Sequence, residues 1–306
     1  MTKKTKTIRL LMPQWQGGNN PNYSFGAELL AWLAPDNDQP LIHVPVQAYD
    51  GTPLENENGM NGRTQLLEQL KAAHHLIHAH KPDRIVMFGG DCLVEQAPFA
   101  YLNERYDGEL GLIWIDAHSD LVRYVGYDNG HTVPLGNLLG EGDEEFAKHV
   151  NIPLKPENVF IAGLAAPTEQ EAKVISEGFQ KLGIGFAEQD TDMIQRLGIR
   201  TAGTEELKNS TAPIKAWIKE RGIKHLAIHL DLDVLDPKAF RSLLFANPEE
   251  PFNLSPQGTM QLPQLLHLLK ELSEETDVVG LGITEHLPWD SIYLKKLLAE
   301  MPILNN

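Results

Sequence analysis

Cysteine is almost absent: Cys92 is the only one in the 306 residues. No disulfide can therefore form within the chain, and a reducing compartment such as the cytoplasm is its expected location. Long apolar runs are also absent, since no stretch approaches the roughly 18 apolar residues that a membrane-spanning helix needs. The first residues lack the apolar segment and small-residue cleavage site of a secretory signal. We expect a protein that neither spans a membrane nor is secreted.

Basic residues are few, with 26 Lys and Arg against 42 Asp and Glu, which gives a formal net charge of -16. The longest basic cluster is Lys3, Lys4 and Lys6. Nucleic acids and anionic membranes are therefore unfavourable partners, because both are bound through clustered positive charge. An acidic field favours cationic ligands such as amines, guanidines and metal ions.

Short apolar segments alternate along the chain with longer segments of helical period. This pattern is typical of an α/β fold in which helices cover both faces of a parallel sheet. The length and the 42% hydrophobic content suit one large core, so residues 1–306 are predicted to form a single domain. The predicted strands are 7–12, 40–46, 84–88, 110–115, 158–162, 184–187, 225–230 and 277–282. The predicted helices are 26–33, 64–80, 94–105, 169–182, 205–221, 263–275 and 291–300.

The strongest local feature is an apolar strand that ends in three potential metal ligands at alternate positions, Asp116, His118 and Asp120. Alternate side chains of an extended segment point to the same side. We expect these three to converge beyond the carboxyl end of a buried strand, where ligands bind in open α/β sheets. The alternative is that the aspartates only cap the turn that follows.

A second strand repeats the arrangement, with Asp231 and Asp233 on one side and Asp236–Pro237 closing a turn. Four carboxylates at the ends of buried strands would repel one another strongly without cations, which favours a metal site over simple capping. Carboxylates with one imidazole suit Mn²⁺ or Mg²⁺ better than structural zinc. Two such ions can lower the pKa of a shared water and so supply a nucleophile for hydrolysis.

Three motifs in the right order and spacing resemble the signatures of arginases and agmatinases. They are Gly89-Gly90-Asp91-Cys92, Asp116-Ala117-His118-Ser119-Asp120 and the segment from His229 to Pro237, HLDLDVLDP. The resemblance extends to Glu285 and covers about two thirds of the chain. It implies the ureohydrolase fold, a three-layer α/β/α sandwich around a mostly parallel sheet, here of about eight strands. It also implies two Mn²⁺ ions, hydrolysis of a guanidino group to urea and an amine, and a homo-oligomer.

The resemblance also implies roles for individual residues. One metal would be held by Cys92, Asp116, Asp120 and Asp231, and the other by Asp116, His118, Asp231 and Asp233. Asp120 would orient the attacking water, His131 would carry protons to the leaving amine, and Glu285 would pair with the guanidinium. Asn129 is a candidate for binding a polar group of the substrate, although a turn role beside Gly130 is equally consistent.

Cys92 departs from the family pattern, which has a histidine ligand at this position. Three hypotheses remain open. A thiolate could ligate the metal and shift the preference toward softer ions such as Zn²⁺; a neutral thiol could leave one metal weakly bound or absent; or Cys92 could itself attack the guanidino carbon, which needs a lowered pKa and a nearby base. The ligand and weak-site hypotheses are favoured.

Two further positions depart from the pattern. The segment Ala165-Ala166-Pro167-Thr168 replaces acidic residues that help an arginase hold the amino-acid end of arginine, so another guanidino or hydroxyguanidino substrate is equally favoured. His229 replaces a small hydroxyl residue and could crowd or tune the site.

The leading prediction is a manganese-dependent hydrolase of a small cationic guanidino compound. The main alternative is a catalytically degenerate relative that binds a ligand or a partner. A third hypothesis, an amide hydrolase of the same fold, is disfavoured because the Glu285 carboxylate suits a cation.

Overall fold

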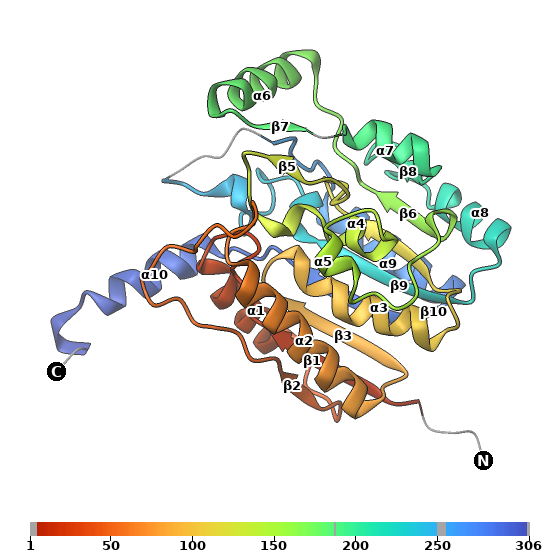
Figure 1. Ribbon diagram of the computed structural model, residues 1–306, viewed down its shortest axis with the longest axis horizontal. Helices are drawn as coiled ribbons and strands as arrows, with labels where there is room; N and C mark the ends of the chain where they lie inside the picture. Colours follow the sequence, from red (N-terminus) through yellow and green to blue (C-terminus); the bar gives the residue numbers. More distant parts are fainter. Residues whose placement is uncertain (1–4, 187, 250–254, 305–306) are drawn as a thin grey trace.

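The computed structural model describes residues 5–186, 188–249 and 255–304. Its centre is a parallel sheet of eight strands in the order β2-β1-β3-β10-β9-β4-β6-β8 (Figure 1). These strands are β1 Thr7–Met12, β2 Leu41–His43, β3 Arg84–Gly89, β4 Gly111–Ile115, β6 Val159–Ala162, β8 Arg200–Ala202, β9 His225–Asp231 and β10 Asp277–Thr284. The interior strand β4 is buried along its whole length, as expected for a parallel strand covered on both faces.

The helices are α1 Asn22–Leu33, α2 Arg63–His80, α3 Gln96–Arg105, α4 Pro134–Leu139, α5 Glu144–Ala147, α6 Glu169–Leu182, α7 Asp190–Leu197, α8 Ala212–Arg221, α9 Leu262–Glu275 and α10 Trp289–Ala299. Helices α2, α3 and α4 pack on one face of the sheet, and α1, α8 and α9 pack on the other. The three-layer α/β/α sandwich predicted from the sequence is therefore confirmed. Within the described residues, no helix combines the length and hydropathy needed to cross a bilayer.

One predicted strand was misplaced. Of the segment 184–187, Gly185–Phe186 forms β7, which pairs antiparallel with β5 (Tyr124–Val125) outside the central sheet, and Ala187 lies outside the described residues. The eighth strand of the central sheet is β8, which the sequence did not reveal. It is short, and Arg200 and Thr201 are exposed, so it has none of the apolar run that marks the other strands.

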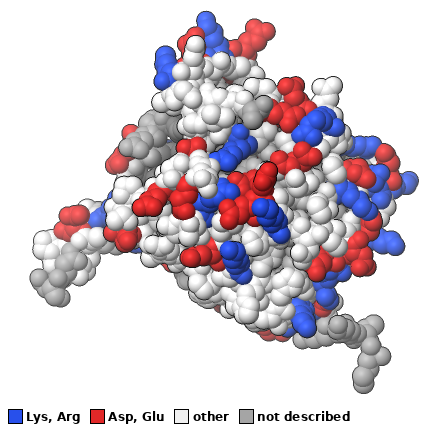
Figure 2. All heavy atoms as spheres, in the orientation of Figure 1, with Lys and Arg blue, Asp and Glu red and all other residues white. Residues whose placement is uncertain are grey.

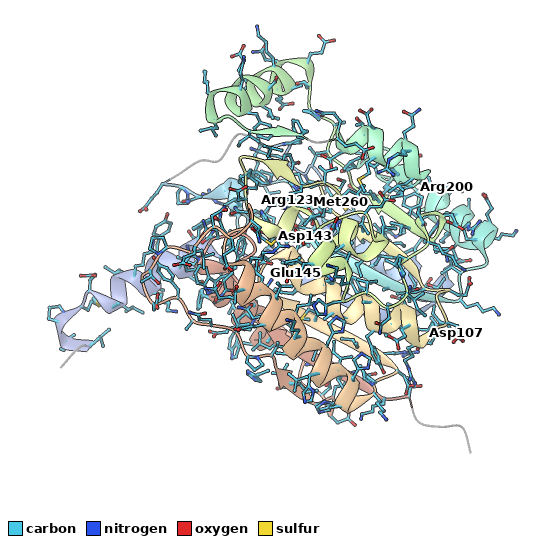
Figure 3. All side chains as sticks on the ribbon, in the orientation of Figure 1. Asp107, Arg123, Asp143, Glu145, Arg200 and Met260 are labelled. Atoms are coloured by element: carbon cyan, nitrogen blue, oxygen red, sulfur yellow. The ribbon has the colours of Figure 1, made fainter. Side chains whose placement is uncertain are left out.

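Ion pairs tie the elements on the α2 face together. Arg63, at the start of α2, donates two hydrogen bonds of 2.8 and 2.6 Å to the Asp143 carboxylate, which also caps α5. Arg123 lies 3.5 Å from the same carboxylate, in the segment that leads from Asp120 to His131 (Figure 3). On the face drawn in Figure 2, basic and acidic side chains are interspersed over the described residues.

Candidate metal centre

Four adjacent strands, β3, β10, β9 and β4, end at the same edge of the sheet and bring the motif residues together. Cys92 follows β3, Glu285 follows β10, Asp231 ends β9 and Asp116 follows β4. Carboxyl ends of parallel strands are where open α/β sheets bind ligands. The three motifs, which are far apart in sequence, therefore form one site.

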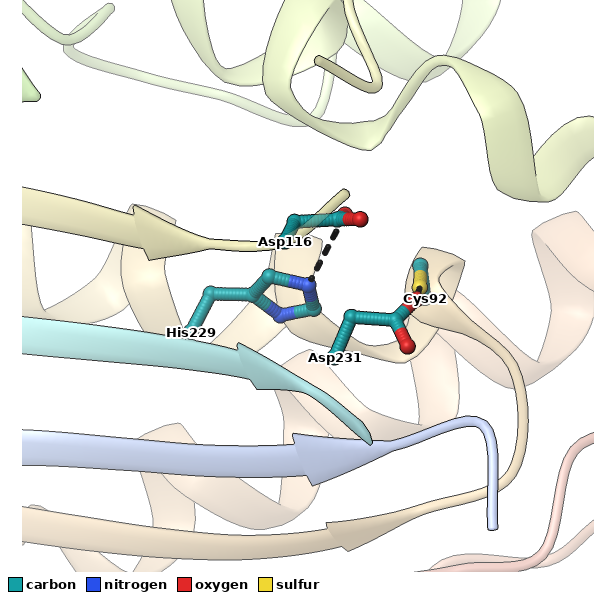
Figure 4. A group of neighbouring side chains, drawn as sticks. All are labelled: Cys92, Asp116, His229 and Asp231. Carbon is teal, nitrogen blue, oxygen red and sulfur yellow. Dashed lines mark hydrogen bonds and ion pairs between the residues drawn. The ribbon is translucent and has the colours of Figure 1, made fainter. Parts of the chain in front are cut away.

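The first cluster consists of Cys92, Asp116, His229 and Asp231, whose candidate ligand atoms all lie within 4.8 Å of one another (Figure 4). The Cys92 thiol donates a hydrogen bond of 3.0 Å to Asp231 Oδ2 and lies 3.7 Å from Glu285 Oε1. Burial, followed by the charge of Asp231, raises the pKa of Cys92 well above its usual value. Without a metal the residue is thus a protonated hydrogen-bond donor, which weighs against the nucleophile hypothesis.

The second cluster consists of Asp116, His118 and Asp233. The Nδ1 atom of His118 lies 3.1 Å from Asp233 Oδ2 and 3.5 Å from Asp116 Oδ1. The Nε2 atom lies 2.7 Å from the Ser255 hydroxyl, which fixes the ring. Asp116 belongs to both clusters, which is the position that a bridging ligand would occupy.

Two residues occupy positions that differ from the expected ligand sets. Asp231 belongs to the first cluster alone, and Asp120 belongs to neither. The backbone of Asp120 has a left-handed φ of 50°, and its Oδ2 is buried without a hydrogen-bond partner in the described structure. Burial, followed by the charge of Asp116, raises the pKa of Asp120 well above its usual value.

The donor atoms of these clusters fit divalent cations. Oδ1 of Asp233 and Oδ2 of Asp120 are buried and lack hydrogen-bond partners among the described residues. Burial and the charge of Asp233 also raise the pKa of Asp231. Buried carboxylates without partners are costly, and cations at this edge would neutralise them. Mostly oxygen donors with imidazole match hard or borderline divalent ions.

A hydrogen-bonded pair lies next to the clusters. His131 Nδ1 is 3.1 Å from Glu285 Oε1, and His131 Nε2 is 3.3 Å from the Tyr127 hydroxyl. Burial alone would lower the pKa of His131, but the Tyr127 oxygen and Glu285 outweigh it and raise that pKa well above its usual value. The pair with Glu285 therefore favours the protonated form of His131, which can donate a proton. Sequence reasoning did not identify Tyr127 or the buried Tyr23, whose pKa is raised by burial and by Glu285.

Asn129 makes contacts that favour the turn role. Its Oδ1 accepts a hydrogen bond of 3.1 Å from Asn61, and its Nδ2 lies 3.4 Å from the carbonyl oxygen of Gly18. Both groups of the amide therefore hold loops together.

Comparison with known proteins places this arrangement in a family. The model of the arginase family matches residues 28–291. The chain belongs to the arginase family. An arginase of Staphylococcus aureus (strain MRSA252) is 27% identical over 199 residues, which cover 63% of this chain and 61% of that protein. The chain thus spans less than two thirds of the length of this curated relative.

Solved structures show the same fold. The arginase of Bacillus caldovelox superposes with a TM-score of 0.70 at 18% identity, covering 93% of this chain and 91% of the other. The proclavaminate amidino hydrolase of Streptomyces clavuligerus superposes with a TM-score of 0.60 at 17% identity, covering 94% and 84%. At these identities the likeness establishes the architecture.

The departures at positions 92 and 229 meet in one place. The arginase-family pattern has histidine at position 92 and a small hydroxyl residue at position 229, whereas this chain has Cys92 and His229. Both side chains are in the first cluster. His229 was expected only to crowd or tune the site, yet it lies among the candidate ligands.

Proposed function

We propose that the chain is a metal-dependent hydrolase that cleaves a cationic guanidino compound to urea and an amine, with two Mn²⁺ ions as its cofactor. The observation that carries this proposal is the position of the Glu285–His131 pair beside a group of buried carboxylates, in which Asp120 Oδ2 and Asp233 Oδ1 lack hydrogen-bond partners among the described residues. An anionic group for the guanidinium, a proton donor and a cation site lie within one edge of the sheet.

Each residue has a defined task in this proposal. Asp116, His118, Asp231 and Asp233, with the donors at the Cys92 end, would hold the ions. When bound, the ions supply Lewis acidity, which lowers the pKa of a water molecule for attack on the guanidino carbon. The Glu285 carboxylate pairs with the guanidinium. Asp120 accepts a hydrogen bond from the attacking water, and protonated His131 gives its proton to the leaving amine.

The substrate is expected to differ from L-arginine at its far end. A cleft of about 820 Å³ extends beside the metal centre, with Ser255, a contact of His118, on its wall. Its lining includes Ala166 and Pro167, where the family pattern has acidic residues. The cleft is also lined by one lysine, Lys238, and by four acidic residues, Glu171, Glu205, Glu206 and Asp236, so the net charge of its lining is negative. An amine at the far end of the substrate therefore suits the cleft better than a carboxylate, and agmatine is the first compound to test.

The test combines metal content with product formation. The protein is purified with added Mn²⁺, its metals are measured by elemental analysis, and urea release is followed with agmatine, arginine, guanidinobutyrate and hydroxyarginine. We expect about two ions per chain and urea from one of these compounds. Bound metal without urea from any guanidino compound would contradict the hydrolase. Absence of both would favour the alternative of a degenerate relative that binds a ligand or a partner.

A further inference from the structure

His229 is fixed in the middle of the sheet by its two neighbouring strands. On β4 its partner in the strand register is Trp114, whose ring stacks on the imidazole at a centroid distance of 3.6 Å. On β10 its partner is Gly282. The space above this glycine is filled by Glu95, because a Cβ atom added there would lie 1.6 Å from Glu95 Oε1. The imidazole is therefore held between the indole of Trp114 and the carboxylate of Glu95.

The two ring nitrogens of His229 and the carboxylate oxygens of Glu95 make no hydrogen bonds within the described residues. His229 Nδ1 lies 3.8 Å from Glu95 Oε1, and His229 Nε2 lies 3.7 Å from Asp116 Oδ2. Both His229 and Glu95 are fully buried, and neither the ring nitrogens nor the Glu95 oxygens have a hydrogen-bond partner in the described structure. Buried polar atoms without partners are rare and costly, and such a group often marks a ligand that is bound in the working protein.

We propose that His229 Nε2 is the imidazole ligand of the metal at the Cys92 end, replacing the histidine that the family pattern has at position 92. The inference rests on the proposed metal-dependent function and names the ligand set for this chain. Two atoms that ligate one ion at about 2.0–2.3 Å are at most about 4.6 Å apart. The four candidate atoms already lie within 4.8 Å of one another, so small side-chain shifts complete the site.

Glu95 acts as the positioning residue in this arrangement. A histidine that binds a metal usually donates its other ring N–H to a carboxylate, which fixes the tautomer and the ring orientation. Glu95 Oε1 faces Nδ1 on the side of the ring away from Asp116. With Nε2 on a metal, Nδ1 would be left to donate to Glu95 after a small shift, and Gly282 provides the room for that carboxylate.

The test compares His229→Gln with His225→Gln. His225 lies on the same strand, but it pairs with Asp277 at 3.0 Å, away from the metal centre. Affinity for Mn²⁺ and for Co²⁺ is measured by competition with a chelator, without substrate. We expect His229→Gln to weaken the binding of one ion by more than about 10-fold and to leave the ion at Asp116, His118 and Asp233 bound. The control variant His225→Gln should bind both ions as the wild type does. Unchanged affinity in a folded His229→Gln variant would overturn the proposal.

A rescue experiment separates ligation from a purely structural role. Moving the imidazole back, in the double variant Cys92→His/His229→Gln, should restore the affinity that His229→Gln loses. If His229 only held the Asp116 side chain in place, a histidine at position 92 could not substitute for it. Absence of rescue in a folded double variant would therefore overturn the proposal.

Glu95→Gln provides a test that keeps the imidazole in place. This variant should lower the affinity for the same ion by about 10-fold. An affinity equal to that of the wild type would contradict the role of Glu95. These affinities are independent of turnover. Suppose that the wild type binds two ions tightly, that one of them depends on His229, and that no urea is released. This result would refute the proposed function and leave the ligand assignment intact.

Discussion

Glu285 combines burial, charge and an unusual backbone at a single residue. Its φ of 61° lies in the left-handed region, which non-glycine residues seldom adopt, and its amide donates a 2.8 Å hydrogen bond to the carbonyl oxygen of Gly90. A strained backbone of this kind persists when the surrounding structure holds it, and it is common at functional sites. Here it directs a carboxylate toward His131 and the thiol of Cys92.

Replacing Glu285 with Gln should remove the negative charge with little change of shape. Because the side chain is buried, loss of its pairing with a guanidinium is expected to lower kcat/KM by about 100-fold or more. Urea release from the preferred substrate measures this effect. The content of bound Mn²⁺ serves as the control and should stay at the wild-type level, and wild-type kcat/KM would contradict the role of Glu285.

The sequence did not predict that Asp120 joins neither cluster or that Asp231 joins only one. Part of the clustering could be predicted, because strand ends in a parallel sheet share an edge. Cys92, Asp116 and Asp231 lie in one cluster for this reason. His229 was accessible to the same argument, since it is two residues before Asp231 on the same face of β9. The sequence could not predict how His229 packs inside the sheet, because the space for its ring depends on Gly282 and Glu95, which lie in other elements.

At the scale of elements, β10 and the segment after β3 are fitted together through one glycine. A Cβ atom at position 282 would overlap the Glu95 carboxylate at 1.6 Å, and both are buried. Ala227 and Leu102 crowd the same strand near Gly280. Close approach to β10 therefore requires glycine at positions 280 and 282.

Gly282→Ala should lower the free energy of unfolding by about 1–3 kcal/mol through overpacking. Denaturant unfolding measures the change, and Gly185→Ala, where nothing lies within 4 Å of the added carbon, should have little effect. Adding Glu95→Ala removes the carboxylate that the new methyl group would overlap. The double variant should therefore lose less stability than the sum of the two single changes. Additive losses would show that Glu95 is not the source of the strain.

Helix α2 carries a histidine that should make stability depend on pH. Burial, followed by the charges of His78 and His149, lowers the pKa of His74 to about 4. The unfolded value is about 6.5, so the unfolded chain binds more protons between these values and stability falls as pH decreases from about 6.5 to 4. The loss at pH 5 relative to pH 8 is about 2 kcal/mol.

His74→Gln is therefore expected to flatten the dependence of unfolding free energy on pH in this window, whereas the exposed neighbour His75→Gln should leave it unchanged. Urea unfolding at pH 5 and pH 8 provides the comparison. Equal slopes for wild type and His74→Gln would contradict the assignment.

Elements with strong local signals could be predicted to the residue, and those without could not. Helix α6 matches its predicted bounds, since Thr168 and Glu171 form a capping box and Gly183 ends the helix with a φ of 70°. Helix α8 begins at Ala212 rather than at residue 205, because residues 204–209 form turns and bends, and Pro213 suits the first turn of the helix that follows. Strand β8 is fixed by pairing with β6, a tertiary contact that leaves no pattern in its own residues.

For the whole molecule, the metal centre is a source of instability until cations bind. Carboxylates from three strand ends are buried together, and the pKa values of Asp120 and Asp231 are raised by that burial. In the folded protein without metal, these carboxylates must therefore either bind protons or repel one another as buried charges at the edge of the sheet. We propose that the ions contribute to the stability of the fold as well as to its chemistry.

Removal of metal by a chelator should lower the melting temperature. A free ion at about 100 times its Kd stabilises the native state by about 2.7 kcal/mol, which for 306 residues corresponds to a shift of about 4 °C per ion. Differential scanning calorimetry with and without Mn²⁺ measures it. An unchanged melting temperature would contradict binding at this centre, and Asp231→Asn, which lacks a key donor, should show a smaller shift.

The placement of Cys92 and His229 also bears on descent. Position 92 follows β3 and position 229 lies in β9, so the two side chains approach the same cluster from opposite sides of β10. On the ligand exchange proposed above, an ancestor with histidine at both positions would have carried one imidazole more than the ion required. Either histidine could then be lost without a generation that lacked a nitrogen ligand. Relatives with histidine at both positions would have the ligand set expected for that intermediate.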